Sequence, residues 1–326
     1  MLRIGFMGAG SIAHKMAVTV TGMNQEVAQV CAVGARDLER AREFAARYHI
    51  EKAYGSYEAL LADPDIDLIY IGTPHSHHAR CMKQCLEAGK HVLCEKPFTV
   101  TRQEAEEIFA LAAEKHLFVT EALWTRYMPS RKMIDDIIKS GVIGEVTSLT
   151  ANLGYELSQV KRIWDPNLAG GALLDVGVYL IHFARMIFGE DITSISSDAR
   201  FSQSGVDYCD SLTINFAGDR QAVLHCNVKA VLNRNGSVFG TKGYLEVVNI
   251  NNPEKILVFD ENYQQVAAYD VPQQITGYEY EVEASAKAVA QGQLECSEIS
   301  HQETLEVLAI MDQLRKDWGY EIPVLK

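Results

Sequence analysis

One carboxylate, one phenol and one imidazole stand at helical spacing in the segment between Gly170 and His182. Asp175, Tyr179 and His182 stand at positions i, i+4 and i+7, which an α-helix places on one face. The residues between them are mostly Leu, Val and Ile, and polar groups are costly to bury there without partners. The spacing predicts a polar site that binds hydroxyl groups and moves a proton. The alternative for Tyr179 or His182 taken singly is a satisfied core position.

An ammonium group is expected close to a ligand at the end of a predicted strand, in the run Cys94-Glu95-Lys96-Pro97. In open α/β sheets the carboxyl ends of the strands meet the ligand, so Lys96 is expected to point into a ligand crevice. There it can hydrogen-bond a substrate hydroxyl or lower the pKa of a neighbouring acid. The alternative is a surface lysine, which the turn fixed by Pro97 makes less favourable.

The start of the chain predicts a site for a phosphate-bearing ligand. An apolar run leads directly into Gly8-Ala9-Gly10-Ser11-Ile12-Ala13. This is the glycine-rich turn of a dinucleotide-binding βαβ unit, in which Gly8 permits the turn, Gly10 admits the pyrophosphate and Ala13 allows close packing. The anion lies on free N–H groups at the helix N-terminus. The cofactor-binding candidates here are Gly8, Gly10, Ser11 and Ile12.

Arginines follow the second predicted strand, about twenty residues after the glycine turn, where dinucleotide sites bind the ribose. An acid there binds the 2′-hydroxyl of NAD, whereas an arginine accommodates the 2′-phosphate of NADP. Arg36 holds this place and Arg40 lies one helical turn on, so both can face one phosphate. This favours NADP. Asp37 keeps two alternatives open, because it can be the ribose acid of an NAD site or the N-cap of a helix with solvated arginines.

The segment Thr73-Pro74-His75 follows the third predicted strand and is expected to form a loop at the nicotinamide end of the cofactor. Histidines and cysteines gather here and on the following helix, at His75, His77, His78, Cys81 and Cys85. They can be read as metal ligands, but their spacing matches no recognised zinc pattern. We therefore predict no metal site.

A scaffold of alternating strands and helices must position these residues. Strands are predicted at Arg3–Met7, Val27–Val33, Leu68–Ile71, His91–Cys94 and Phe118–Thr120. Helices are predicted between them at Leu38–Tyr48, Ser56–Ala62, His77–Ala88 and Arg102–Glu114. This alternation is typical of a parallel sheet covered on both faces. Residues 1–121 are therefore predicted to be a doubly wound, dinucleotide-binding Rossmann domain.

After Pro129 the pattern changes to period-2 segments typical of an antiparallel sheet. Strands are predicted at Val146–Leu153, Ile192–Arg200, Asp210–Phe216, Ala222–Val231, Ser237–Gly240, Gly243–Asn249 and Lys255–Asp260. Helices are predicted at Arg131–Ser140, Leu173–Phe188, Gly277–Gln291 and His301–Trp318. Residues 122–326 are predicted to be an α/β domain for substrate binding and oligomerisation, with a large, mostly antiparallel open sheet. The C-terminal helix is expected to pack back on the first domain.

Composition narrows the class of protein. The chain has 326 residues, of which 48% are hydrophobic and 22% charged, as in soluble globular proteins. The net charge of -13, without a basic patch, argues against a nucleic-acid partner. Seven cysteines without framework spacing indicate reduced thiols. No signal segment or apolar run of about 18 residues is apparent, so a cytoplasmic protein without a membrane partner is expected.

Three motifs in this order, spread over the whole chain, resemble the Gfo/Idh/MocA oxidoreductases: Gly8–Ala13, Glu95-Lys96-Pro97 and Gly171–His182. Three further segments look most like the dimeric dihydrodiol dehydrogenase branch, which also oxidises D-xylose. They are Ala35–Leu38, Ala53–Tyr57 and Glu121–Pro129.

This resemblance implies a Rossmann domain and an α/β domain whose open sheet often forms a dimer interface. It implies that Lys96 and Tyr179 match the catalytic pair of the branch, and that Arg36 and Arg40 match its 2′-phosphate ligands. In related inositol and sugar dehydrogenases a histidine commonly takes the place of Tyr179. This chain departs from that pattern toward the phenol, with His182 as a second candidate acid–base.

The expected reaction passes a hydride between a sugar, polyol or cyclic diol hydroxyl and the nicotinamide of NADP. The phenol of Tyr179, whose free pKa is about 10, needs the ammonium of Lys96 beside it before it accepts a proton at neutral pH. The cofactor contacts expected beyond the glycine turn are Arg36, Arg40, Thr73, Pro74, His75, Glu95 and Lys96. The substrate contacts expected are Asp175, His182, Trp124 and Arg126.

Several alternatives stay open at this point. One is an NAD-dependent inositol or sugar dehydrogenase, and another is a sugar-to-sugar exchange on one tightly held cofactor. A third is a non-catalytic NADP-binding regulator, against which the retained set of Lys96, Tyr179 and His182 speaks. The expected partners are a small-molecule substrate and further copies of the chain, as a homodimer or higher homo-oligomer through the C-terminal sheet.

Overall fold

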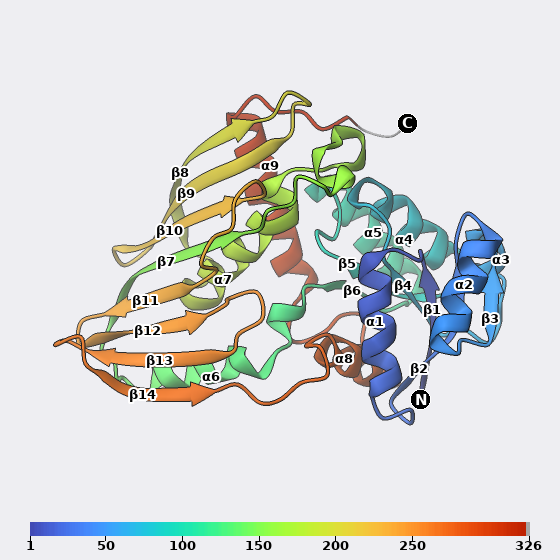
Figure 1. Ribbon diagram of the computed structural model, residues 1–326, viewed down its shortest axis with the longest axis horizontal. Coiled ribbons are helices and arrows are strands. Elements are labelled where there is room, and N and C mark those ends of the chain that lie inside the picture. The colour runs from blue at the N-terminus through green and yellow to red at the C-terminus, as the bar shows by residue number, and fades with distance from the viewer. Residues whose placement is uncertain (324–326) are drawn as a thin grey trace. The chain divides into compact units, whose positions relative to one another are not determined.

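The computed structural model describes residues 1–323 of the chain (Figure 1). Two compact units can be distinguished from the contacts between residues. The first unit comprises Met1–Tyr127 and Gln274–Ala309, and the second comprises Met128–Gln273 and the residues after Ala309. The domain limits expected from the sequence, 1–121 and 122–326, stay a prediction.

The first unit is built on a six-stranded sheet in the order β3-β2-β1-β4-β5-β6. All neighbouring strands are parallel, and this is the strand order of a doubly wound dinucleotide-binding fold, as predicted. The strands are β1 (Leu2–Met7), β2 (Ala28–Gly34), β3 (Lys52–Tyr54), β4 (Leu68–Ile71), β5 (His91–Glu95) and β6 (Val119–Ala122). Five were expected, and the three-residue edge strand β3 was missed.

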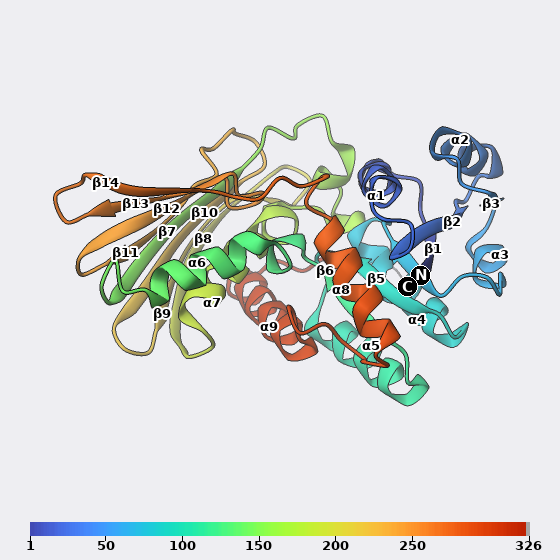
Figure 2. The same cartoon turned by 90° about the horizontal axis from the view of Figure 1, so that it is seen from below.

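Helices cover this sheet, and three of them begin at a side-chain cap. The helices and 3₁₀ turns are α1 (Ser11–Gly22), α2 (Leu38–Tyr48), α3 (Tyr57–Leu61), η1 (His75–His77), α4 (His78–Glu87), α5 (Arg102–Lys115), η2 (Trp124–Arg126) and α8 (Glu279–Ala290), with the first half of α9 (His301–Asp317). Asp37, Ser56 and Thr101 cap α2, α3 and α5. Late in the sequence, α8 joins this unit and packs beside α1, as Figure 2 shows.

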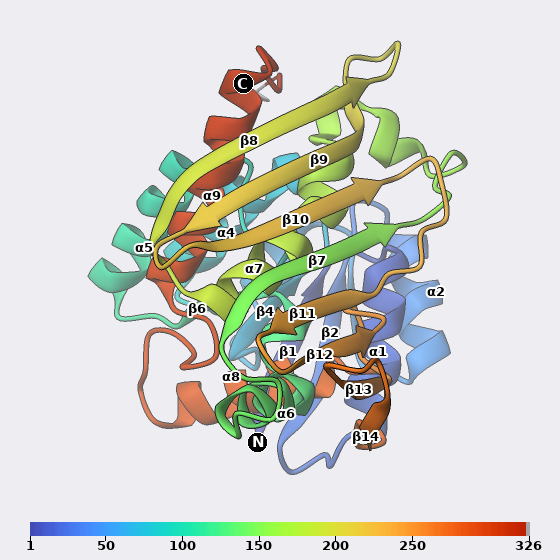
Figure 3. The ribbon, with the colours of Figure 1, turned by 90° about the vertical axis from the view of Figure 1, so that its left-hand side faces the viewer.

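The second unit contains an eight-stranded sheet in the order β14-β13-β12-β11-β7-β10-β9-β8 (Figure 3). Its strands are β7 (Val146–Gly154), β8 (Ile192–Phe201), β9 (Asp207–Phe216), β10 (Arg220–Asn227), β11 (Gly236–Gly240), β12 (Gly243–Val248), β13 (Lys255–Asp260) and β14 (Gln265–Asp270). Every pairing is antiparallel except that of β7 with β10, which confirms the mostly antiparallel sheet. The edge strand β14 was missed, and β10 ends four residues before the predicted limit at Val231.

Alternation along the strands decides which face of this sheet is covered. In β9, Leu212, Ile214 and Phe216 are buried, whereas Ser211 between the strand's buried positions is exposed. The remaining helical elements of the unit are α6 (Pro129–Lys139), η3 (Lys161–Trp164), η4 (Pro166–Leu168), η5 (Leu173–Gly177), α7 (Val178–Phe188) and the end of α9. In Figure 3, α7 lies behind the sheet, on its covered face.

The helix that carries Asp175 and Tyr179 starts at a buried carboxylate. Oδ2 of Asp207 accepts a hydrogen bond of 2.6 Å from the backbone N–H of Leu173. Burial and the charge of Asp207 raise the pKa of Asp210 well above its usual range, and burial also raises the pKa of Asp207. The buried carboxyl group of Asp207 thus holds the first turn of this helix.

One segment of the second unit, Pro166–Phe188, is long and apolar enough to span a membrane, with a mean hydropathy of 1.5. This corrects the expectation that the chain has no apolar run of about 18 residues, although Asp, His and Gly residues interrupt the segment. Of its most apolar window, 89% is buried inside the protein, which is the behaviour of a core helix.

The turn before this helix generates a stability prediction. Gly171 has a φ of +114°, and a Cβ there would lie 2.2 Å from Oδ1 of Asp207. We expect Gly171→Ala to cost about 3 kcal/mol or more in the free energy of unfolding, because strain and a buried clash add. Gly205, with a φ of +89° and nothing within 4 Å of its Cβ position, is the matched control. Gly205→Ala should cost only about 1–2 kcal/mol of backbone strain. Urea denaturation compares the two, and equal losses would contradict the assigned clash.

Candidate functional site

The glycine-rich turn joins β1 to α1 at the carboxyl edge of the parallel sheet. Gly8 has a φ of +104°, and a Cβ there would lie 3.1 Å from the carbonyl oxygen of Gly72, so the turn after β1 touches the end of β4. Gly10 is the N-cap of α1, without a side-chain cap and without an acid in the first turn. The N–H groups at Ser11 and Ile12 therefore have no side-chain cap and are available to an anion, unlike those at the starts of α2, α3 and α5.

The turn after β2 shows what Asp37 does. Its Oδ1 accepts hydrogen bonds from the backbone N–H groups of Glu39 at 2.9 Å and Arg40 at 3.3 Å, so the N-cap alternative is confirmed. Arg40 reaches back from α2 and donates to the carbonyl oxygen of Ala9 over 2.9 Å, which joins this turn to the glycine-rich turn. Arg36 is exposed beside them.

A third arginine, not singled out from the sequence, comes close to these two. Burial raises the pKa of the Tyr57 phenol, and the positive charges of Arg36, Arg40 and Arg80 oppose that rise. Arg36 and Arg80 also contribute to lowering the pKa of His77, after burial. The three guanidinium groups thus all act on the phenol of Tyr57. Arg80 lies on α4, far along the chain, so only the fold reveals its place.

The loop Thr73-Pro74-His75 follows β4 and is tied to the turn after β5. Nδ1 of His78 lies 2.9 Å from the carbonyl oxygen of Pro97, and its Nε2 lies 3.0 Å from that of Thr73. Burial lowers the pKa of His78 to about 4, so a neutral imidazole donates to one of the two carbonyl groups. His75 is buried at the start of η1. Cofactor candidates from two strands are therefore held together.

Lys96 follows β5, as predicted, and its peptide bond to Pro97 is cis. Beside it, the buried carboxylate of Glu95 accepts a hydrogen bond of 2.6 Å from the hydroxyl of Tyr70. Tyr70 is in β4, so this contact links the two strand ends that carry Thr73 and Lys96.

Trp124 and Arg126 lie in η2, directly after β6. The Trp124 ring stacks on Tyr278 with centroids 4.2 Å apart and an interplanar angle of 10°. Arg126 lies against the last helix, with Nη1 3.6 Å from Oε1 of Glu303 and Nε donating to the carbonyl oxygen of Glu298 over 3.1 Å. Tyr278 precedes α8 and was not anticipated, because nothing local marks it.

Asp175, Tyr179 and His182 belong to the second unit and are all buried. Oδ1 of Asp175 accepts a hydrogen bond of 3.0 Å from Nη1 of Arg162, a partner that the sequence analysis did not name. The segment Leu173–Gly177 is a π-helical turn and not α-helix. The α-helical spacing assumed for Asp175 therefore does not hold, and π-turns of this kind are frequent at functional sites.

The predicted site residues are thus divided between the two units. The turns of the first unit carry Gly8, Gly10, Ser11, Ile12, Arg36, Arg40, Thr73, Pro74, His75, Glu95, Lys96, Trp124 and Arg126. The second unit carries Asp175, Tyr179 and His182.

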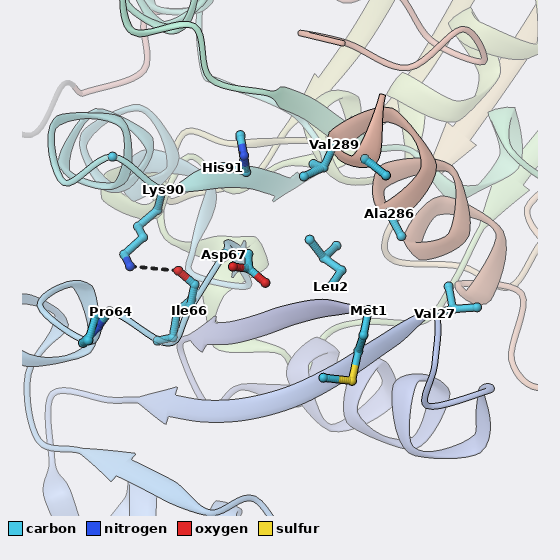
Figure 4. Close-up of a pocket in the computed structure, with 12 residues that line it drawn as sticks. Met1, Leu2, Val27, Pro64, Ile66, Asp67, Lys90, His91, Ala286 and Val289 are labelled. Carbon is cyan, nitrogen blue, oxygen red and sulfur yellow. Dashed lines mark hydrogen bonds between the residues drawn. The ribbon is translucent and has the colours of Figure 1, made fainter. Parts of the chain in front are cut away.

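A cavity of about 410 Å³ lies away from these turns, at the amino ends of the parallel strands (Figure 4). Leu2, Asp67 and His91 line it. The ammonium of Lys90 also lies there and donates to the carbonyl oxygens of Asp63 and Ile66 over 2.7 and 2.8 Å. Because the ammonium group in this cavity binds backbone carbonyl groups and stabilises the fold, this cavity is not the candidate site.

Family models match both parts of the chain. Residues 2–123 match the model described as an oxidoreductase family with an NAD-binding Rossmann fold, and residues 132–246 match the GFO/IDH/MocA C-terminal domain.

Curated relatives match over nearly the whole length. The trans-1,2-dihydrobenzene-1,2-diol dehydrogenase of Danio rerio is 36% identical over 98% of this chain and 97% of its own. The enzyme of the same name from Homo sapiens is 34% identical over 99% of this chain and 98% of its own.

Solved structures show the same fold. A 3-ketoreductase from Actinomadura kijaniata, in complex with NADP and TDP-benzene, has a TM-score of 0.89 and 27% identity over 97% of each chain. An aldose-aldose oxidoreductase from Caulobacter crescentus has a TM-score of 0.84 at 20% identity, over 97% of this chain and 96% of its own. The family models, the relatives and the strand order agree, and this chain belongs to the Gfo/Idh/MocA family of oxidoreductases.

Proposed function

We propose that this protein is an NADP-dependent dehydrogenase that oxidises a hydroxyl group of a sugar, polyol or cyclic diol. The observation that carries the cofactor assignment is the turn after β2, where Asp37 is used as a helix cap while Arg36 and Arg40 accompany it. The relatives named as dihydrodiol dehydrogenases and the ketoreductase solved with NADP support the reaction class.

The proposed cofactor site uses contacts within the first unit. The uncapped N-terminus of α1 suits a pyrophosphate, because its N–H groups have no side-chain acceptor. The guanidinium groups of Arg36 and Arg40, with Arg80 nearby, suit a 2′-phosphate, which a neutral 2′-hydroxyl does not require. Asp37 is less available as a ribose ligand in this arrangement, since its Oδ1 already accepts two backbone hydrogen bonds.

The loops after β4 and β5 are proposed to hold the nicotinamide end. His78 and the contact of Tyr70 with Glu95 fix Thr73, Pro74, His75 and the residues around Lys96 relative to one another. Such fixed placement contributes to rate by orienting the reacting groups. The nicotinamide, when bound, supplies the acceptor for the hydride.

Lys96 and Tyr179 are proposed as the catalytic pair. Tyr179 would take the proton of the substrate hydroxyl, and the ammonium of Lys96 would stabilise the phenolate that this requires. Asp175, held by Arg162, and His182 are proposed to bind further hydroxyl groups. Trp124, stacked on Tyr278, offers an aromatic surface that suits a sugar or diol ring.

A homodimer is proposed through the open face of the sheet in the second unit. Aromatic rings gather there, with Tyr244 stacked on Phe259 at 4.6 Å and Phe239 5.8 Å from Tyr244. Val223 on β10 is 44% exposed. Apolar groups of this kind on a sheet face commonly mark a protein interface.

A cytoplasmic location is also proposed, because each of the seven cysteines is a free thiol.

Cofactor selectivity gives the first test. Arg36→Ala should weaken NADP binding about 10- to 100-fold and leave NAD binding within twofold, because only NADP carries the phosphate. Calorimetry with both cofactors measures this. Arg42→Ala is the control, since Arg42 lies on α2, just after the turn with Arg36, and pairs with Glu39. NADP binding that Arg36→Ala leaves unchanged, with NAD bound more tightly than NADP, would contradict the NADP assignment and favour an NAD-dependent inositol or sugar dehydrogenase.

The proton acceptor gives the second test. Tyr179→Phe should lower kcat about 10²- to 10⁴-fold and leave the Kd of NADP unchanged, because the phenol acts in proton transfer and not in cofactor binding. Steady-state oxidation of a panel of sugars and cyclic diols, with NADP reduction as the signal, measures it. Tyr263→Phe is the control, since that side chain is 80% exposed. Unchanged turnover in a folded Tyr179→Phe variant would remove the phenol from the mechanism.

A further inference from the structure

We propose that Glu121 is a positioning residue for Lys96, and that it acts by holding the backbone of the turn that follows this lysine. The proposal deepens the proposed function and rests on it for the role of Lys96. Glu121 touches neither of the proposed catalytic side chains through a hydrogen bond in the described residues, so its effect would be indirect.

The geometry of Glu121 ties three segments of the first unit together. Its Oε1 accepts a hydrogen bond of 2.9 Å from the backbone N–H of Phe98, two residues after Lys96. Its Oε2 accepts a hydrogen bond of 2.9 Å from the hydroxyl of Thr304 on α9. Its own carbonyl oxygen accepts a hydrogen bond of 2.9 Å from Tyr127. Both carboxylate oxygens are thus used to connect the turn after β5 with β6 and α9.

Register explains why the carboxylate can reach this turn. In the parallel pairing of β5 with β6, Glu121 lies opposite Cys94, which immediately precedes Glu95 and Lys96. The turn is held from other sides by His78, which contacts the carbonyl group of Pro97, and by the thiol of Cys94, 3.8 Å from the carbonyl oxygen of Phe98. Glu121 contributes the charged acceptor of this set.

The environment makes the charge of Glu121 sensitive to pH. The side chain is buried, and burial raises its pKa to about 7, while Thr304, Phe98 and Lys96 favour the ionised form and Glu303 opposes it. Glu303 itself is paired with Arg126. The charged and titratable groups facing Glu121 are therefore Lys96 from the turn, Cys94 from β5, Glu303 from α9, and Arg126 behind Glu303.

Ionisation should tighten the turn. Above pH 7 the carboxylate accepts from both Phe98 and Thr304, and a charged acceptor forms the stronger hydrogen bonds. Below pH 7 the protonated acid is a weaker acceptor, so the backbone after Lys96 is held less firmly. Catalysis that depends on the placement of Lys96 should therefore rise as the pH increases through about 7.

The stability of the folded protein should change with pH in the opposite direction to catalysis. Because the folded-state pKa of Glu121 is raised from its ordinary value, the folded state retains a proton that the unfolded state releases. This costs stability as the pH rises from about 4 to about 7, and the cost is complete above pH 7. An uncharged glutamine of the same shape avoids it. An acid at this buried position is therefore unfavourable for folding at neutral pH.

The experiment compares Glu121→Gln with wild type from pH 5 to pH 9. We expect kcat/KM at pH 8 to fall about tenfold and its rise near pH 7 to disappear, while the Kd of NADP changes less than twofold. We also expect the Tm of the variant to equal or exceed that of wild type at pH 8, with the difference shrinking toward pH 4.5. Activity lost without loss of stability separates positioning from a structural role.

Two further variants make the test decisive. Glu104→Gln is the matched control, because Glu104 also accepts two backbone N–H bonds, from Val100 and Thr101, but forms a helix cap. Its pH profile should equal that of wild type. Thr304→Val removes one donor and keeps the carboxyl group, so it should move the rise in kcat/KM to higher pH. It also serves if Glu121→Gln does not fold. A Glu121→Gln profile within twofold of wild type at every pH would overturn the proposal.

A readout that needs no turnover separates this proposal from the proposed function. Acylation of lysines by a small anhydride at pH 8, followed by mass spectrometry, reports the reactivity of Lys96 in each variant. Loosening of the turn after Lys96 should expose its side chain more often and make it react at least about threefold faster, with the exposed Lys115 as internal reference. If wild type oxidises no substrate, the proposed function fails, but the acylation rates still test whether Glu121 positions Lys96. Equal acylation rates of Lys96 in wild type and in Glu121→Gln would overturn the positioning role.

Discussion

The parallel pairing of β1 with β2 and β4 is the constraint on which the proposed site depends. It brings the carboxyl ends of these strands to one edge, where the glycine-rich turn touches Gly72 and Arg40 reaches Ala9. Continuing the same sheet through β5 and β6 adds the turns with Lys96 and Trp124. Residues scattered over more than a hundred positions of the sequence thus gather at one edge of the sheet. A change at Gly8 would disturb this edge first, because two backbones meet there.

Buried carboxyl groups support the candidate residues in both units. Glu121 holds the turn after Lys96, and Asp207 holds the first turn of the helix with Asp175 and Tyr179. In each case burial raises the pKa of an acid, so the protein retains a group that is unfavourable for folding at neutral pH. A charged acceptor binds backbone N–H groups more strongly than a neutral one, which suits loops whose position matters for chemistry.

Much of the fold could be predicted from local patterns. Buried strands have the apolar patterns that burial imposes, since β1 and β4 are almost continuous apolar runs and buried residues alternate along β7. The two missed strands lie at sheet edges. β3 has only three half-buried residues and β14 is almost entirely exposed, so neither bears such a pattern. The π-turn at Leu173–Gly177 was also invisible, because its apolar residues fit an α-helix equally well and its contacts with other segments are nonlocal.

The sequence by itself determined the residue types of the site: a glycine turn without a cap, arginines after the second strand, and a lysine and a tyrosine suited to proton transfer. These signals are local, since they depend on spacing along one strand–turn–helix unit. Only the tertiary structure decided that Asp37 is a helix cap, that Arg80 joins the arginines, that Arg162 partners Asp175 and that Glu121 reaches the turn after Lys96. Each of these four roles depends on contacts between distant segments or on which acceptor binds a particular backbone N–H group. The spacing of residues along the sequence determines neither.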